Sequence, residues 1–310
     1  MQLFLSYIPT AFTQVAMLAV LIAVGFAADK AHIYSEKTAR ATNDLLFYII
    51  TPSVIVNSFQ KVELTAQNGL GFLFSALIAA AFHAVMMLVV PLLHRKAKDR
   101  AVFCYGTMYG NVGYMGLPLA QAVAGELGVF YCSAVVAVFN MFAFTHGVKL
   151  MQREKGEMNW KKLIINPGAL GILIGLPLFL LNIKLPTVLS APIGYLGSMN
   201  TPLAMLMLGT YLAHTDLLEM FRRKENYIVA VLKLLVWPFV GITVLYLIGI
   251  RGELLLSSSV FLAAPTATNT VMFSAKYGHD TGVASKLCGF TTMLAIFTMP
   301  VCMALAKALG

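Results

Sequence analysis

Long apolar runs separated by short polar clusters organise the whole chain. Most runs contain about 20 residues or more, which is the length that an α-helix needs to cross the hydrocarbon core of a bilayer. The pattern therefore predicts an all-α integral membrane protein with ten transmembrane helices. The predicted spans lie near residues 8–28, 39–59, 68–93, 100–123, 127–150, 163–182, 189–213, 226–249, 253–277 and 282–308.

Two of these spans are interrupted by helix-breaking residues. The fourth contains Gly110-Asn111-Val112-Gly113-Tyr114-Met115-Gly116-Leu117-Pro118, and the ninth contains Ala264-Pro265-Thr266-Ala267-Thr268-Asn269. Irregular backbone inside a membrane survives only where protein or a wet cavity satisfies its polar groups. Paired breaks of this kind in the two halves of a chain are typical of the binding site of a secondary transporter.

The two halves of the chain resemble each other at an offset of about 150 residues. Thr51-Pro52 in the second span matches Thr201-Pro202 in the seventh, and the broken fourth span matches the broken ninth. Five spans per half is an odd number, so the halves must have opposite orientations in the bilayer. We therefore expect two inverted five-helix repeats, residues 1–155 and 156–310, in which broken helices 4 and 9 cross.

Composition agrees with a membrane location and gives an orientation. Hydrophobic residues make up 59% of the chain, charged residues only 11%, and the mean hydropathy is +0.80. Of the 22 basic residues, about 17 lie in the odd-numbered connections. The opposite side holds Lys61, Lys184, Arg251 and Lys307. By the positive-inside rule the odd-numbered loops are cytoplasmic, and both termini are extracytoplasmic in the plasma membrane. The net charge of +9 is thus explained by topology and not by nucleic-acid binding.

Other chemistry is not indicated. The four cysteines, Cys104, Cys132, Cys288 and Cys302, lie in apolar segments, where small apolar packing explains them better than a disulfide or a metal. The sequence contains no metal-ligand cluster, nucleophile–base pairing or nucleotide loop, so we expect neither an enzyme nor a cofactor.

The breaks predict where a solute binds. Crossed half-helices bring positive helix N-termini to one region, where free N–H groups and the amides of Asn111 and Asn269 bind a carboxylate. Asn140 in the fifth span either lines the same cavity or makes a helix–helix hydrogen bond. The candidate binding residues are Asn111, Gly113, Tyr114, Met115, Pro118, Asn140, Pro265, Thr266, Thr268 and Asn269. The candidate hinge or helix-break residues are Gly110, Gly116, Pro52 and Pro202.

The distribution of charge inside the spans favours an anionic or zwitterionic solute. No Asp or Glu occupies either break, whereas a desolvated cation usually needs negative ligands. His83, His146 and Lys233 are candidates for coupling to an ion. The alternative interpretation is that the two histidines are packing residues and that Lys233 extends its ammonium to the membrane interface. The coupling ion stays open between a proton, sodium and none.

The motifs together resemble those of the auxin efflux carrier family, which includes plant auxin exporters and bacterial malonate and malate permeases. The matching segments are 110–118, Leu46-Phe47-Tyr48-Ile49-Ile50-Thr51-Pro52, Leu232-Lys233-Leu234-Leu235-Val236-Trp237-Pro238, 264–269 and Ala275-Lys276-Tyr277-Gly278. The resemblance implies a dimerising scaffold, residues 8–59 and 163–213, and a moving transport domain, residues 68–150 and 226–308. It also implies elevator-type motion and a carboxylate site centred on Asn111, Pro118 and Pro265.

We therefore expect a carrier of small organic anions such as malonate, malate or auxin-like acids. Its expected partners are this anion, the lipid bilayer and a second copy of the chain. One alternative is a sodium- or proton-coupled symporter of a carboxylated or amino-acid solute, with a fold like that of bile-acid transporters. Another is a channel or a membrane sensor, which would not show the saturation and counterflow of a carrier.

Overall fold

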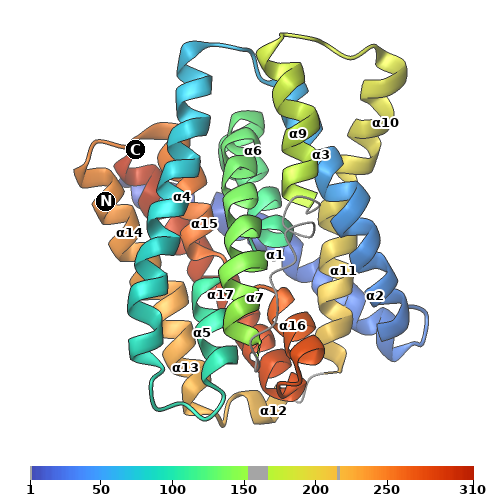
Figure 1. The fold of residues 1–310 in the computed structure, drawn as a ribbon, viewed down its shortest axis with the longest axis vertical. Coiled ribbons are helices and arrows are strands. Elements are labelled where there is room, and N and C mark those ends of the chain that lie inside the picture. The colour runs from blue at the N-terminus through green and yellow to red at the C-terminus, as the bar shows by residue number, and fades with distance from the viewer. Residues whose placement is uncertain (1, 153–166, 215–216) are drawn as a thin grey trace.

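The structure, a computed structural model, describes residues 2–152, 167–214 and 217–310, and within these ranges it is a bundle of helices without strands (Figure 1). The predicted boundary between the halves at residue 155, and the start of the sixth predicted span at residue 163, lie outside the described ranges. The α-helices are α1 (Gln2–Lys30), α2 (Glu36–Leu45), α3 (Thr51–Lys61), α4 (Ala66–Leu93), α5 (Arg100–Met108), α6 (Leu117–Phe142), α7 (Val148–Met151), α9 (Pro167–Leu180), α10 (Thr187–Ser198), α11 (Asn200–Ala213), α12 (Leu217–Met220), α13 (Lys224–Val231), α14 (Trp237–Leu247), α15 (Gly252–Ala263), α16 (Asn269–Tyr277) and α17 (Thr281–Leu309).

Several helical segments are long and apolar enough to cross a membrane. They are Ala66–Leu93, Val112–Met151, Lys224–Leu247 and Thr281–Leu309, and two shorter apolar helices cover Leu170–Leu180 and Gly252–Ala263. The 40-residue segment is divided at Gly125, whose φ of 61° and ψ of −152° are not helical. The helices thus support a multi-pass membrane protein, and the count of ten spans stays a prediction.

Three π-helical turns occur directly before a proline. They are η1 (Leu46–Ile50), η2 (Val112–Gly116) and η4 (Leu232–Val236), and in each case a proline is the second residue of the helix that follows. Proline has no N–H, and its ring collides with the carbonyl four residues earlier in a regular α-helix. The residue before each proline instead donates to the carbonyl five residues earlier, as Trp237 does to Leu232. The wider turn lets the helix continue past the proline.

The connections between helices gather at two ends of the bundle (Figure 1). Residues 62–65, 181–186 and 248–251 lie at the upper end, and residues 94–99 and 221–223 lie at the lower end. The lower connections carry Arg95, Lys96, Lys98, Arg222 and Arg223, whereas the upper connections carry Lys184 and Arg251, so basic residues are more frequent in the described connections of the lower end.

Helices α1 and α11 pack against each other through glycines. A Cβ atom on Gly25 would overlap the backbone of Leu206, and one on Gly209 would overlap the backbone of Ile22. Close backbone approach through small residues is a common form of helix packing in membranes. The contact joins the first and seventh predicted spans, which belong to the predicted scaffold.

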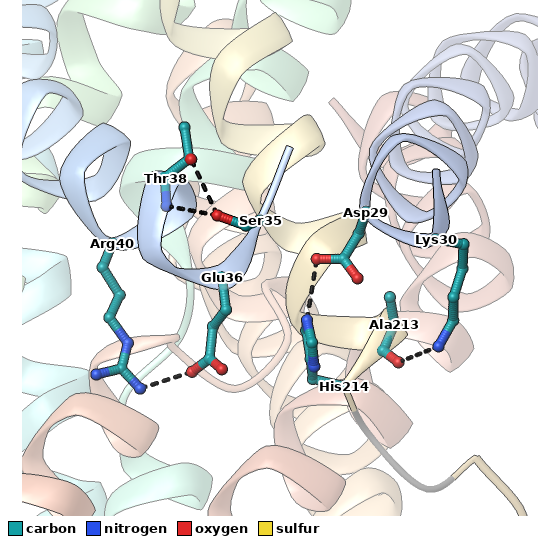
Figure 2. Close-up of polar contacts among 8 residues, drawn as sticks. All are labelled: Asp29, Lys30, Ser35, Glu36, Thr38, Arg40, Ala213 and His214. Atoms are coloured by element: carbon teal, nitrogen blue, oxygen red, sulfur yellow. Dashed lines mark hydrogen bonds and ion pairs between the residues drawn. The ribbon is translucent and has the colours of Figure 1, made fainter. Parts of the chain in front are cut away.

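Polar contacts at the ends of α1 and α11 strengthen this pair (Figure 2). The buried Asp29 carboxylate lies 3.0 Å from Nε2 of His214, and the Lys30 ammonium donates to the carbonyl of Ala213 at 2.9 Å. These contacts connect helix ends that lie far apart in sequence.

Candidate functional site

The two broken segments meet backbone to backbone. Gly110 and Thr266 form an isolated antiparallel bridge. The N–H of Asn111 donates to the carbonyl of Pro265 at 2.7 Å, and the N–H of Ala267 donates to the carbonyl of Tyr109 at 3.0 Å. The breaks therefore satisfy each other's polar groups, which is what irregular backbone at membrane depth requires.

A backbone carbonyl of α5 and a side chain of α17 hold Thr266 in place. Its hydroxyl donates to the carbonyl of Gly106 at 3.0 Å, and its N–H donates to the hydroxyl of Thr291 on α17 at 3.2 Å. Thr266 is completely enclosed by these contacts, so it stabilises the crossing and does not face a cavity.

Four helix ends converge at the crossing. Helices α5 and α15 end there, at Met108 and Ala263, while η2 and α16 begin there, at Val112 and Asn269. A helix N-terminus carries partial positive charge and unsatisfied N–H groups, and a C-terminus carries partial negative charge and unsatisfied carbonyls. The crossing therefore has distinct sides that suit an anion and a cation.

A small cavity lies against the two helix N-termini. Its volume is about 30 Å³, and it is lined by Phe47, Thr51, Gly110, Asn111, Val112, Gly113, Tyr114, Val136, Phe139, Asn140, Ala267, Thr268 and Asn269. A cavity of this size holds one or two water molecules. It must widen before it can hold a carboxylate solute.

Three asparagine side chains share this cavity without a protein partner. Asn111, Asn140 and Asn269 are 4%, 4% and 8% exposed, and none of their side-chain amides is hydrogen-bonded to another residue in the described ranges. By contrast, the buried Asn200 amide donates to the carbonyl of Gly113 at 3.4 Å and accepts from the hydroxyl of Thr51 at 3.5 Å. Their amide atoms are not among the fully buried side-chain atoms that lack a partner, so they border the space of the cavity, where water or a polar ligand can satisfy them.

The cavity includes some sequence-predicted binding residues and leaves out others. Gly113, Tyr114 and Thr268 line it together with the three asparagines, whereas Met115, Pro118, Pro265 and Thr266 do not. Pro265 lies within the bridge, and Pro118 lies in the first turn of α6, beyond η2. The resemblance places both prolines at the centre of the site, but neither lines the small cavity, and they lie in different parts of the crossing.

Sequence reasoning missed several lining residues, of which Val112 and Ala267 lie in the breaks themselves and the others come from neighbouring helical segments. The missed residues are Phe47, Thr51, Val112, Val136, Phe139 and Ala267. The repeated Thr-Pro pair was the available signal for Thr51, since Thr51 precedes the predicted hinge Pro52. The aromatic residues carry no such signal, because phenylalanine is frequent throughout the chain.

The predicted hinge residues all lie at helix irregularities. Pro52 follows η1, Gly116 ends η2, and Gly110 forms the bridge. Pro202 lies in the first turn of α11, just after the interruption at Met199 between α10 and α11.

A larger cavity adjoins the crossing on the side of the basic loops. Its volume is about 530 Å³, and it shares Thr268 and Asn269 with the small cavity. Its wall includes charged residues of both signs, namely Glu36, Arg40, Asp44 and Lys286. Lys286 is paired with Glu219, and Arg40 is paired with Glu36 (Figure 2). The larger cavity is therefore a polar vestibule to the crossing.

Lys233 does not extend to the membrane interface, so the interfacial interpretation is wrong. The side chain is 1% exposed, and its Nζ donates to the carbonyl of Met108, the last residue of α5, at 3.4 Å. Lys233 lies on the buried side of the π-helical turn η4, whose Leu235 and Val236 are exposed on the opposite side.

The two candidate histidines lie outside the small cavity. His83 is buried between the rings of Phe142 and Phe261, and its Nδ1 lies 2.8 Å from the carbonyl of Ala79. His146 is half-buried, and its Nδ1 lies 2.9 Å from the hydroxyl of Tyr109. Both contacts suit a packing role, and a coupling role stays a prediction.

Within the described ranges, no group of three or more His, Cys, Asp or Glu side chains has the arrangement of a metal site, and the four cysteines are free and buried.

Comparison with known proteins identifies relatives over nearly the whole chain. Residues 10–303 match a family described as "Membrane transport protein". A protein of Rhizobium meliloti named "Putative malonate transporter" is 23% identical over 269 residues, which cover 83% of each chain. An uncharacterized transporter of Methanocaldococcus jannaschii is 24% identical over 302 residues, covering 92% of this chain and 95% of the relative. Auxin efflux carrier component 2 of Arabidopsis thaliana is 31% identical over 144 residues, which are 45% of this chain and 22% of the relative.

Proposed function

The chain belongs to the membrane transport protein family, which includes the auxin efflux carriers, and we propose that it is a carrier of small organic anions that binds the anion where its two broken helices cross. The observation that carries this proposal is the convergence of three unpaired amides, from Asn111, Asn140 and Asn269, on one buried cavity.

The chemistry of this cavity suits a carboxylate. Amide NH₂ groups donate two hydrogen bonds each, and the first turns of η2 and α16 present backbone N–H groups beside them. No Asp or Glu lines the small cavity, so a bare cation would find only neutral oxygens there. A carboxylate would gain the hydrogen bonds that the amides lack.

The relatives suggest which anions to test first. One relative is named for malonate, and others are named for auxin efflux. Both solutes are organic acids with a carboxylate, and they differ in the rest of the molecule. A dicarboxylate is the better first substrate here, because the malonate-named relative matches most of the chain whereas the auxin carrier matches less than half.

The architecture that accompanies this function is ten spans in two inverted five-helix repeats. Reading each pair of half-helices as one span, α5 with η2 and the start of α6 forms the fourth span, and α15 with α16 forms the ninth. The collection of basic loops at one end supports cytoplasmic odd-numbered loops and extracytoplasmic termini in the plasma membrane.

The proposed transport cycle is an elevator-type movement of the crossing past a scaffold. Polar contacts near the crossing join the proposed moving part to the scaffold, among them Tyr114 Oη to Asn43 Oδ1 at 3.2 Å and Asn200 Nδ2 to the carbonyl of Gly113 at 3.4 Å. Both must break if the crossing moves. A dimer through the scaffold helices belongs to the same proposal.

Transport by the purified carrier in liposomes tests the function. Charge movement on solid-supported membranes would be recorded for malonate, malate, indole-acetate and neutral amino acids, each with and without sodium or a pH step. We expect a saturable signal for at least one carboxylate. The double variant Asn111→Ala with Asn269→Ala should reduce it at least tenfold, because the carboxylate loses two donors of about 1.5–3 kcal/mol each.

The matched control is Asn68→Ala, since Asn68 lies at the polar start of α4, far in sequence from both breaks, and bonds only to neighbouring residues. Unchanged transport in the double variant would remove the proposed site. Signals from amino acids alone would favour a symporter, and a current that does not saturate would favour a channel.

A further inference from the structure

Lys233 has a buried amine for which the described ion pairs provide no carboxylate. The ion pairs found in the described ranges join Arg40 to Glu36, Lys61 to Glu126, His214 to Asp29, Arg223 to Asp99 and Lys286 to Glu219. None of them includes Lys233. A charged group buried in this way must be stabilised by other polar groups.

The C-terminal ends of the two broken half-helices supply those polar groups. Lys233 Nζ donates to the carbonyl of Met108 at the end of α5. A Cβ atom built on Gly110 would lie 3.1 Å from Nζ and 3.2 Å from the carbonyl oxygen of Ala264, which caps α15. The ammonium and the end of α15 therefore flank the same glycine. Both half-helices present partial negative charge to this point.

The ammonium is also close to the proposed anion site without being part of its wall. Gly110 lines the small cavity and borders Nζ, whereas Lys233 itself does not line the cavity. A positive charge behind this wall favours an anion in front of it, and the desolvated surroundings strengthen the attraction. Lys233 thus acts on the anion through the crossing as a positioning residue.

We propose that the Lys233 ammonium is a built-in cation that takes the place of a separate coupling metal cation at the crossing, so that anion transport does not require sodium. This inference rests on the proposed function, because it assumes that the solute at the crossing is an anion. The new element is the source of the positive charge beside the C-terminal ends of α5 and α15: it is a side chain of the carrier and not a bound metal ion.

Two arms test the proposal. In the first, anion transport by the wild-type carrier in liposomes is compared in sodium and in choline media of equal ionic strength, and we expect equal rates. Lys233→Met, which keeps the side chain's bulk without its charge, should lower the rate at least tenfold at low anion concentration. The control Lys149→Gln removes a charge from an exposed position on α7 and should change the rate less than twofold.

The second arm measures thermal unfolding in detergent and needs no transported solute. The Lys233→Ala variant removes the ammonium beside the carbonyl groups of Met108 and Ala264 and leaves a space there that a sodium ion can enter. Sodium chloride, compared with choline chloride, should therefore raise the unfolding temperature of this variant by several degrees and leave the wild type unchanged.

The outcomes separate this proposal from the proposed function. Wild-type transport that stops without sodium, or Lys233→Met transport with unchanged rate and KM, overturns the built-in cation. If no anion is transported, the proposed function fails, and the unfolding arm still decides: equal effects of sodium on the variant and the wild type overturn the role of Lys233.

Discussion

At the residue scale, the asparagines near the crossing have two kinds of surroundings, and we propose that those facing the cavity bind the solute. Asn200 bonds to Thr51 and to the carbonyl of Gly113, so it links helices. Asn111, Asn140 and Asn269 are as deeply buried, and their amides face a cavity instead of a partner. The same residue type therefore has two roles, which are set by what surrounds it.

Gly110 leaves little room for a side chain at the crossing. A methyl group there would lie 3.1 Å from Lys233 Nζ and 3.2 Å from Ala264 Cβ and its carbonyl oxygen. We predict that Gly110→Ala lowers the unfolding temperature by several degrees, since overpacking of a tight site costs about 1–3 kcal/mol. Thermal unfolding in detergent measures the effect.

The control for this prediction is Gly69→Ala. No heavy atom lies within 4 Å of a Cβ atom at Gly69, and the residue is in the first turn of α4. The unfolding temperature of the Gly69→Ala variant should be equal to that of the wild type or slightly higher, because alanine favours a helix by roughly 0.5–1 kcal/mol over glycine. Equal destabilisation by both substitutions would contradict the tight packing at Gly110.

At the element scale, π-helical turns recur at the residues that matter for the site. Asn111 directly precedes η2, Lys233 lies inside η4, and Thr51 directly follows η1. A π-helical turn holds an additional residue per turn and changes the direction in which side chains project, and such turns often occur at functional sites. The prolines that follow them explain why the regular hydrogen-bond pattern is given up there.

The α1–α11 contact makes a separate prediction about the scaffold. A side chain at Gly209 meets the backbone of Ile22 and Phe26, which cannot rotate away. We predict that Gly209→Ala forces the helices apart and lowers the unfolding temperature by several degrees, an effect of about 1–3 kcal/mol. Size-exclusion chromatography and thermal unfolding of the purified protein check it.

Gly194→Ala on α10 is the matched control in the same half of the chain. A Cβ atom there has only Asn57 Oδ1 within 4 Å, at 3.8 Å, which is ordinary van der Waals contact. This substitution should leave the unfolding temperature within about 1 °C, because surface changes usually cost less than ~0.5 kcal/mol. If Gly209→Ala also left the unfolding temperature unchanged, the inference that α1 and α11 are in close backbone contact would be contradicted.

At the scale of the whole molecule, the vestibule and the basic loops predict one accessible side. Ser285 lines the vestibule, and Gln60 lies near the end of α3, beside the upper connection of residues 62–65 (Figure 1). In a variant without the four native cysteines, Ser285→Cys should react with a membrane-impermeant thiol reagent only from the cytoplasmic side. Gln60→Cys should react only from outside. Labelling of intact cells and of inside-out vesicles measures both.

The four native cysteines are buried and free, and a buried thiol reacts slowly, so the protein that keeps them without an introduced cysteine should label little and serves as a control. The anion substrate should slow labelling of Ser285→Cys if the solute enters by this vestibule. Labelling of Ser285→Cys from outside alone would reverse the proposed orientation of the chain.

The sequence by itself determined the helical membrane character, the position of the two breaks and the absence of carboxylates within them. These properties follow from local residue types: apolar runs of spanning length, and glycine or proline where a helix cannot continue. Even the collection of basic loops at one end followed from counting lysine and arginine between the runs.

Only the tertiary structure decided which of the break residues face a cavity and where Lys233 lies. Pro118 and Pro265 look equivalent in sequence, yet one lies within the bridge and the other in the first turn of α6. Lys233 looks like a residue that reaches the interface, yet its ammonium donates to the carbonyl of Met108, 125 residues away in the chain. Contacts between distant segments depend on how helices pack, and packing is a property of the assembled fold and not of any one segment.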